Sequence, residues 1–207
     1  YGYHYPRDLE TALQSRNGFD NFVNTFSRCL SRGFPNYYFV ADELSKTSPE
    51  QYLDFCRKAG LGCETVTSAD IELEVRKCTL GLKANEVVYD HDVLRSQIKQ
   101  AIQNRKNIRV ECNAGVVYIR QPDSGFKLDL SSGIYVESHA VVNSSYANIN
   151  MFAAMLGNTV DERQYEYTVV PVVETDFEPL GIAIMDGSFP SLMPYGDIIR
   201  APDGTLG

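Results

Sequence analysis

Two segments near the ends of this chain concentrate the residue types that can do chemistry. Residues 2–7 read Gly-Tyr-His-Tyr-Pro-Arg, and residues 185–196 read Met-Asp-Gly-Ser-Phe-Pro-Ser-Leu-Met-Pro-Tyr-Gly. Ordinary connections between elements are polar, whereas both of these segments combine aromatic and ionisable side chains with glycine and proline. Loops of this composition are often shaped around a bound molecule. We therefore predict that the two segments lie close together at the mouth of one cleft for a small molecule.

In the first segment, His4 and Arg7 are the candidates for chemistry. The imidazole of His4 can accept a proton or hold an anion near neutral pH. The guanidinium of Arg7 can bind a carboxylate through two parallel hydrogen bonds. Simpler interpretations stay open: His4 can order its loop by packing. Arg7 can instead form a surface ion pair with Asp8 or Glu10.

Two further groups of residues carry a functional and a structural interpretation side by side. Asp-Gly at residues 186–187 is an ordinary hairpin signal, so the ligand-binding interpretation of that segment rests on Phe189, Met193 and Tyr195. Residues 143–145, Asn-Ser-Ser, follow a Val-Val strand end, where open α/β sheets place their ligands. Their alternative role is a polar helix start.

The elements that must position these residues follow a mixed α/β pattern. The clearest is a helix that begins at Pro49, with Ser48 as N-cap, Gln51 three residues later and Gly60 as its end. Further helices are predicted after Asp8, after Asp90 and over residues 149–156. Strands are predicted over residues 37–41, 65–67, 73–75, 86–89, 108–112, 116–121, 126–130, 133–136, 140–143, 165–173 and 180–185.

Composition excludes several classes of protein. With 207 residues, 43% of them hydrophobic, the chain can bury a sizeable core, and its net charge of −8 argues against a nucleic-acid partner. No apolar run approaches the roughly 20 residues that span a bilayer, so we predict a cytoplasmic protein without a membrane span. The five cysteines form no close pair with metal-ligand spacing, so we predict reduced structural thiols and no metal.

Four stretches, in this order, carry a resemblance to a known family. Residues 2–12 resemble the Gly-x-x-Tyr-x-Pro-x-Ser-x-x-Ala stretch of the D-amino-acid oxidase-like superfamily of FAD-dependent oxidoreductases. Residues 86–102, 137–145 and 180–196 resemble later stretches of the same superfamily. The L-2-hydroxyglutarate oxidases and the oxidoreductases of bacterial polysaccharide clusters are the branches that the chain resembles most.

This resemblance implies FAD chemistry on a small-molecule substrate. The complete protein would oxidise a C–N or C–O bond of an amine, amino acid or hydroxy acid by hydride transfer to the flavin. It implies that His4, Arg7 and Tyr195 orient the substrate as catalytic residues. The implied cofactor contacts are Gly2, Tyr3, Asn143, Ser144 and Ser145, and the implied substrate contacts are Tyr5, Phe189 and Met193.

The glycine turn that receives the FAD pyrophosphate is missing from this sequence. Gly60-Leu61-Gly62 follows a helical pattern rather than a strand, so we interpret it as a helix end. We therefore expect a fragment with three parts: substrate-side elements over residues 1–88, part of a FAD-binding domain over 89–146, and a truncated substrate-side sheet over 147–207. We expect such a fragment to bind FAD weakly or not at all. The alternative is a non-catalytic ligand-binding or interaction domain that keeps this scaffold without a cofactor.

Overall fold

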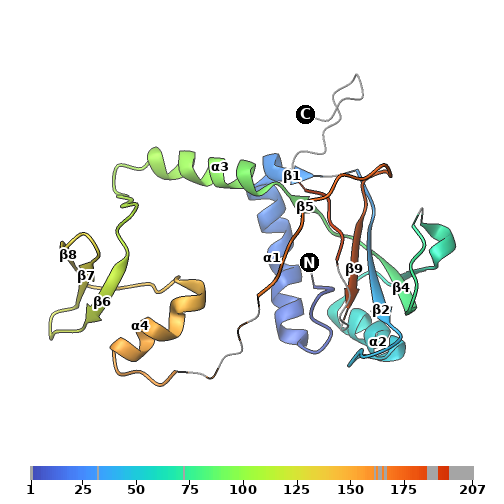
Figure 1. The fold of residues 1–207 in the computed structure, drawn as a ribbon, viewed down its shortest axis with the longest axis horizontal. Helices are drawn as coiled ribbons and strands as arrows, with labels where there is room; N and C mark the ends of the chain where they lie inside the picture. Colours follow the sequence, from blue (N-terminus) through green and yellow to red (C-terminus); the bar gives the residue numbers. More distant parts are fainter. Residues whose placement is uncertain are drawn as a thin grey trace. The chain divides into compact units, whose positions relative to one another are not determined.

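The chain has a mixed α+β fold that divides into two compact units (Figure 1). A computed structural model describes residues 2–31, 33–71, 73–160, 162, 165, 167–185 and 191–195. The first unit consists of residues 1–104 and 172–207, and the second unit consists of residues 105–171.

The first unit is built around a mixed four-stranded sheet with the strand order β3-β4-β2-β9. Its strands are β3 (Glu64–Val66), β4 (Cys78–Ala84), β2 (Asn36–Ala41) and β9 (Gly181–Met185). β4 runs antiparallel to β2 and β3, whereas β9 runs parallel to β2. The parallel pair joins two segments that lie far apart in the sequence, so residues after 180 complete a sheet that residues before 85 begin.

β2 is the central strand because all six of its residues are buried. On one face of the sheet, Tyr38 and Val40 belong to a core cluster with residues of the helix α2 (Pro49–Ala59). On the other face, Tyr37 and Phe39 pack with Leu180 and Ile182. Because both faces of the sheet are covered here, the sequence of β2 is nearly continuously apolar and does not alternate between apolar and polar residues.

Local signals define the helices of the first unit as the sequence predicts. α1 (Leu9–Thr25) begins at Asp8, whose carboxylate accepts from the Thr11 amide, and it continues through Gly18. α2 has a complete capping box between Ser48 and Gln51 and ends at Gly60 in the left-handed conformation. α3 (His91–Gln103) begins at Asp90, whose carboxylate accepts from two backbone amides. Two short strands, β1 (Leu30–Ser31) and β5 (Val88–Tyr89), pair beside the start of α3.

The second unit contains a small antiparallel meander and one short helix. Its strands are β6 (Val116–Arg120), β7 (Phe126–Leu130) and β8 (Tyr135–Ser138), in that order. The helix α4 (Ile149–Met155) follows a single 3-10 turn and packs against β6. Ile119 is the buried hydrophobic residue that this meander contributes among the residues described.

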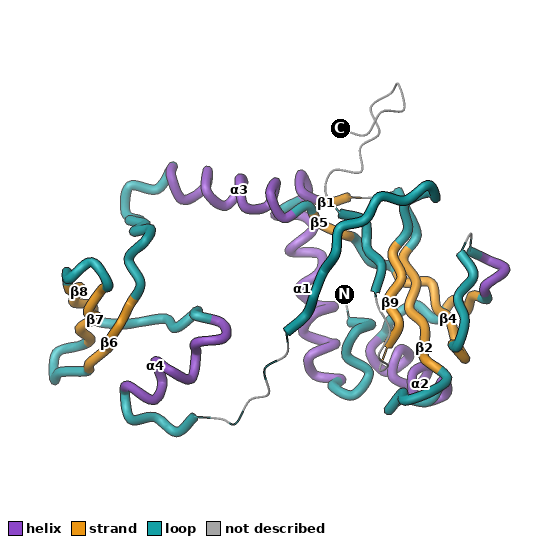
Figure 2. Tube along the Cα trace, viewed as in Figure 1, coloured by secondary structure: helices purple, strands orange, loops and turns teal. Residues whose placement is uncertain are grey.

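Several predicted strands are wrong, and one central strand was missed. The described residues within 73–75, 108–112, 140–143 and 165–173 form no strand, and much of this chain runs as loop in Figure 2. A strand requires a partner for its backbone groups, and none of these segments has one in the described part of the chain.

The strand β4 escaped prediction because Gly81 interrupts its pattern. A side chain at residue 81 would meet the ring of Phe39 at 2.5 Å and the carbonyl oxygen of Val66 at 2.8 Å. Glycine is therefore required here by the close approach of both neighbouring strands, and its presence marks packing rather than a turn.

Candidate functional site

Tyr3 anchors the N-terminal loop to the first core cluster. Its side chain is fully buried, its hydroxyl donates to the carbonyl oxygen of Gly62 at 3.1 Å, and its ring stacks on Tyr38 at 5.5 Å between centroids. The hydroxyl of Tyr52 donates to the Tyr3 carbonyl oxygen at 3.1 Å. A side chain at Gly2 would approach the Ala12 carbonyl oxygen to 2.9 Å. The loop is therefore held in one position by the core beneath it.

His4 and Tyr5 lie on the surface of this anchored loop. The His4 ring contacts Tyr5 and Tyr38 edge-on, with centroid distances of 6.1 and 6.0 Å, and both loop side chains are exposed to solvent. The imidazole of His4 is therefore positioned by aromatic contacts and remains open to a ligand.

A pair of residues that the sequence did not single out lies beneath this loop. The Tyr38 hydroxyl donates to Oε2 of Glu86 at 2.9 Å, and the Asn36 side-chain amide donates to the Glu86 carbonyl oxygen at 3.3 Å. Burial raises the pKa of the Tyr38 phenol well above its ordinary value, and the charge of Glu86 adds to this effect. The phenol is therefore protonated at neutral pH and acts as a donor that holds Glu86 in place.

The described part of the second segment reaches the same sheet. Leu192 pairs with Ile182 in an antiparallel bridge at the edge of β9. A side chain placed at Gly181 would lie 3.2 Å from the Met193 sulfur and would also clash with Asn36. Met193 therefore lies near the end of β2 that carries Asn36, on the face of the sheet where Tyr38 meets the N-terminal loop.

The structure describes one of the two other residues predicted in that segment. Tyr195 is exposed, and its ring lies 5.7 Å from that of His91 at the start of α3. Phe189 lies outside the described residues. A common site for His4, Met193 and Tyr195 stays a prediction.

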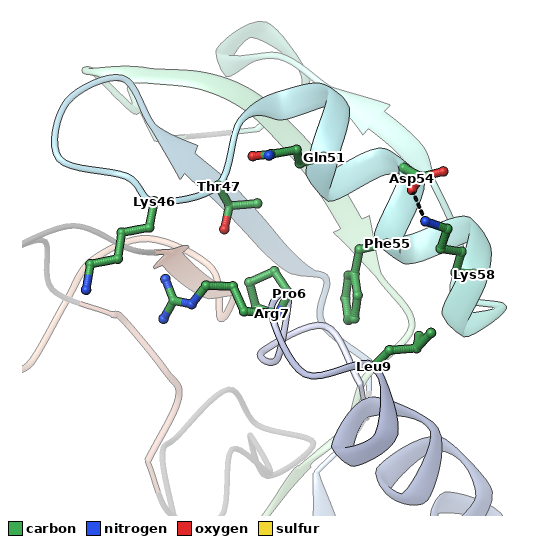
Figure 3. Close-up of a pocket in the computed structure, with 9 residues that line it drawn as sticks. All are labelled: Pro6, Arg7, Leu9, Lys46, Thr47, Gln51, Asp54, Phe55 and Lys58. Carbon is green, nitrogen blue, oxygen red and sulfur yellow. Dashed lines mark ion pairs between the residues drawn. The ribbon is translucent and has the colours of Figure 1, made fainter.

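Arg7 lines a hollow with residues of α2 and of the loop before it. The lining residues are Pro6, Arg7, Leu9, Lys46, Thr47, Gln51, Asp54, Phe55 and Lys58 (Figure 3). The hollow has a volume of about 340 Å³. We call it the cationic hollow, because three of these residues are cations and only Asp54 is an anion.

The other predicted cofactor contacts belong to the second unit. The Asn143 side chain accepts from the amide and the hydroxyl of Ser145, at 3.2 and 2.6 Å, and donates to the Ile149 carbonyl oxygen at 3.0 Å. These bonds shape the turn before α4, whereas Ser144 is exposed. Their role as cofactor contacts stays a prediction.

Comparison with known proteins identifies solved structures that share the fold of this chain. A glycine oxidase from Geobacillus kaustophilus matches with a TM-score of 0.53 and 18% identity, covering 75% of this chain and 46% of the oxidase. An L-proline dehydrogenase from P. horikoshii matches with a TM-score of 0.54 and 12% identity, covering 72% of this chain and 42% of the dehydrogenase. No family model and no curated protein matches the sequence.

These matches establish the fold and the extent of the likeness. The chain spans less than half the length of each of the two enzymes. Within the described part of the chain, no helix is long and apolar enough to cross a membrane. The two structural matches show that this chain shares its mixed α+β fold with part of a glycine oxidase and part of an L-proline dehydrogenase.

Proposed function

We propose that this chain is part of a FAD-dependent oxidoreductase that oxidises a C–N or C–O bond of a small amine, amino acid or hydroxy acid. The observation that carries the proposal is the fold shared with two enzymes named for amino acid oxidation, over 75% and 72% of the chain. The resemblance of residues 2–12 to the D-amino-acid oxidase-like superfamily supports it independently. The complete protein would supply the remaining parts of the cofactor site.

The N-termini of the three longest helices do not fit the pyrophosphate of FAD. Dinucleotide pyrophosphates bind at helix N-termini, where backbone amides and the helix dipole favour an anion. Here the first turns of α1, α2 and α3 carry acidic side chains, which are Glu10, Glu50 and Asp92. Asp8 and Asp90 add further carboxylates at the caps of α1 and α3. These termini repel a pyrophosphate, so we propose no catalytic step through FAD in this chain alone.

The residues of the N-terminal loop are assigned to binding and orientation of the substrate. His4 sits on a loop that is held by Tyr3, and its exposed imidazole can take or hold a proton at the surface of the sheet. Arg7 can bind a carboxylate, and Tyr5, Met193 and Tyr195 can supply apolar and aromatic contact area. Residues 143–145 are proposed as contacts of the flavin in the complete protein, whereas Gly2 and Tyr3 are buried and are assigned to holding the loop.

One observation favours the alternative, a ligand-binding domain without a cofactor. The acidic first turns of α1, α2 and α3 make these helix N-termini poor hosts for a dinucleotide pyrophosphate. The two candidate functions therefore differ in whether flavin is required.

A flavin titration tests the proposal in two steps. We expect no saturable change in flavin fluorescence when FAD is added to this chain at micromolar concentrations. Stoichiometric binding would contradict the conclusion that this chain alone does not fit the FAD pyrophosphate. A longer form of the chain, extended by the sequence that encodes a strand, a glycine turn and a helix, should instead retain a flavin absorbance spectrum. Its anaerobic reduction by amino acids and hydroxy acids then identifies the substrate class.

Variants of two histidines make this test specific to the loop. In the longer form, His4→Gln should slow flavin reduction by about 100- to 10,000-fold, the range expected for loss of proton transfer. His139→Gln, at an exposed position of the second unit, is the matched control and should leave the rate unchanged. A longer form that binds no flavin would favour the alternative function.

A further inference from the structure

We propose that one face of the antiparallel meander in the second unit binds a neutral, extended oligosaccharide. The meander consists of β6, β7 and β8 (Figure 1). We call the binding surface the tyrosine face, and its residues are Tyr118, Arg120, Lys127, Asp129, Tyr135 and Glu137. It lies entirely within the second unit, so it is independent of the N-terminal loop and of the oxidoreductase function.

The strand register places two tyrosine side chains on the same face of the sheet. Tyr118 of β6 lies opposite Asp129 of β7, which in turn lies opposite Tyr135 of β8. Side chains of directly opposed residues share a face, so the two rings flank a central carboxylate. Ile119, the buried residue of this meander, follows Tyr118 and therefore lies on the other face. The apolar side of the sheet and the tyrosine face are thus opposite sides.

The charged residues of the tyrosine face neutralise one another. One nitrogen of Arg120 donates to both carboxylate oxygens of Asp129, at 3.1 and 2.8 Å, and the Lys127 ammonium lies 3.9 Å from the Glu137 carboxylate. Two cations and two anions leave no net charge on this face. It therefore attracts a polyanion or a cation only weakly, but its paired groups still offer hydrogen-bond donors and acceptors to the hydroxyl groups of a neutral ligand.

The two tyrosine rings are held in place but stay open to solvent. The Lys127 ammonium lies 3.6 Å from the centroid of the Tyr135 ring, and the Arg120 guanidinium lies 5.9 Å from that of Tyr118. Cation–π contacts of this kind favour one orientation of the ring. Tyr118 and Tyr135 are nevertheless 46% and 56% exposed. Each ring can therefore stack with a ligand on the surface that its cation leaves free.

A carbohydrate has the chemistry that this face can satisfy. A sugar ring carries C–H groups on its two sides, which stack on aromatic rings, and hydroxyl groups around its edge, which both donate and accept hydrogen bonds. Tyr118 and Tyr135 lie on strands separated by β7, so their Cα atoms are about 10 Å apart. An extended chain of sugars can place its first and third rings over them, whereas a single sugar reaches only one tyrosine.

The test is an NMR titration of the intact chain with cellohexaose, an extended oligomer of glucose. We expect saturable shifts in the amides of residues 116–138, and glucose should bind at least about 10-fold more weakly because it reaches one ring at a time. Maltohexaose, a curved oligomer of the same sugar, should also bind more weakly. Equal binding of glucose and cellohexaose, or no binding of cellohexaose at millimolar concentration, would overturn the proposal.

Single-stranded DNA is the competing ligand, because aromatic side chains beside cations also stack on bases. The cations of the tyrosine face are already paired, and the formal net charge of the chain is −8. We therefore expect oligothymidylate to bind more weakly than cellohexaose in the same titration. Tighter binding of oligothymidylate would replace the carbohydrate by a nucleic acid and overturn the proposal.

Variants at the two tyrosines identify the face as the place of binding. Tyr118→Ala and Tyr135→Ala should each weaken cellohexaose binding by about 5- to 10-fold, the loss of one stacking contact. Tyr167→Ala, which removes a fully exposed tyrosine outside the sheet in the same unit, is the matched control and should leave the affinity within about twofold. Unchanged affinity in both alanine variants of the face would contradict the site.

Phenylalanine variants separate stacking from a loss of folding. Tyr118→Phe and Tyr135→Phe keep the aromatic ring, so they should keep the wild-type affinity for cellohexaose. An equal loss of affinity in the phenylalanine and the alanine variants would contradict stacking as the mode of binding. Because the assay contains no flavin, its outcome is separate from that of the flavin titration.

Discussion

The two units of this chain differ sharply in how many of their apolar side chains they bury. The first unit covers both faces of its central strand, and Tyr3, Tyr52 and Leu82 are fully buried there. In the described part of the second unit, Ile119 is the single buried hydrophobic residue, whereas Val142 and Val169 are each 88% exposed. Burial of apolar surface is the main favourable contribution to folding, so the first unit has a core of its own and the second has little of one.

Predicted strands formed in both units, wherever a segment found a partner to pair with. Residues 37–41 and 180–185 are apolar runs that found neighbours, and they became β2 and β9. Residues 108–112, which alternate apolar and polar side chains, and residues 140–143 were also predicted as strands in the second unit, and they remain without strand structure and largely exposed. Sheet structure is therefore a property of a pair of segments, and a β-type sequence alone does not produce it.

The largest expected effect is a difference in cysteine reactivity between the units. Cys112 of the second unit is exposed, whereas Cys56 of the first is fully buried, and burial raises the pKa of the Cys56 thiol to about 12. We expect a thiol reagent to label Cys112 at least about a thousandfold faster, because Cys56 reacts only when the core opens. Mass spectrometry of timed, quenched samples measures both rates. Similar rates at the two sites would mean that the first unit has no stable core.

Core truncation should be the next largest effect. Leu82→Ala removes a fully buried side chain from β4 and should lower the free energy of unfolding by about 2–5 kcal/mol. Val117→Ala removes a side chain from β6 that is 53% exposed, and its effect should stay within about 0.5 kcal/mol. Urea denaturation of both variants provides the comparison. An equal cost at the two positions would show that the second unit buries Val117 in solution.

Removal of a helix N-cap should also lower the stability more in the first unit than in the second, by a smaller amount than core truncation. Ser48→Ala removes the side-chain oxygen that accepts from the Gln51 amide and should cost about 1 kcal/mol of stability. Asn148→Ala, at the start of α4, removes a residue whose side chain makes no capping hydrogen bond, and it should have almost no effect. Thermal unfolding measures the loss of stability in each variant. A larger loss in Asn148→Ala than in Ser48→Ala would contradict the prediction.

The smallest expected effect is a pH dependence at the start of α1. Hydrogen bonds from the hydroxyl and the amide of Thr11 lower the pKa of Asp8 below its ordinary value of 3.8. A group with a lowered folded pKa contributes stability above pH 4, and this contribution is lost as the pH falls through its folded pKa. The difference in urea midpoint between wild type and Asp8→Asn should therefore shrink between pH 6 and pH 2. In Thr11→Val, which lacks the hydroxyl donor, the same difference should depend less on pH, and equal dependence would contradict this origin.

The sequence by itself determined the features that depend on near neighbours in the chain. Asp8, Ser48 and Asp90 were predicted as helix starts, and each accepts hydrogen bonds from amides within three residues. The buried run at residues 37–41 was also recognised, because its length and composition suit a strand covered on both faces. The N-terminal loop was identified as a candidate site from its residue types alone.

Only the tertiary structure decided which of these elements meet. Tyr38 and Glu86 form a hydrogen bond although they are separated by 48 positions in the sequence, and no local sequence pattern predicts a partner so far along the chain. Arg7 and Lys46 share one hollow because α2 packs against the same core that anchors the loop. Capping bonds close over a few residues and are therefore readable from the sequence. Strand pairing and the cationic hollow depend on contacts between distant segments, whose free energy is gained only when the whole core assembles.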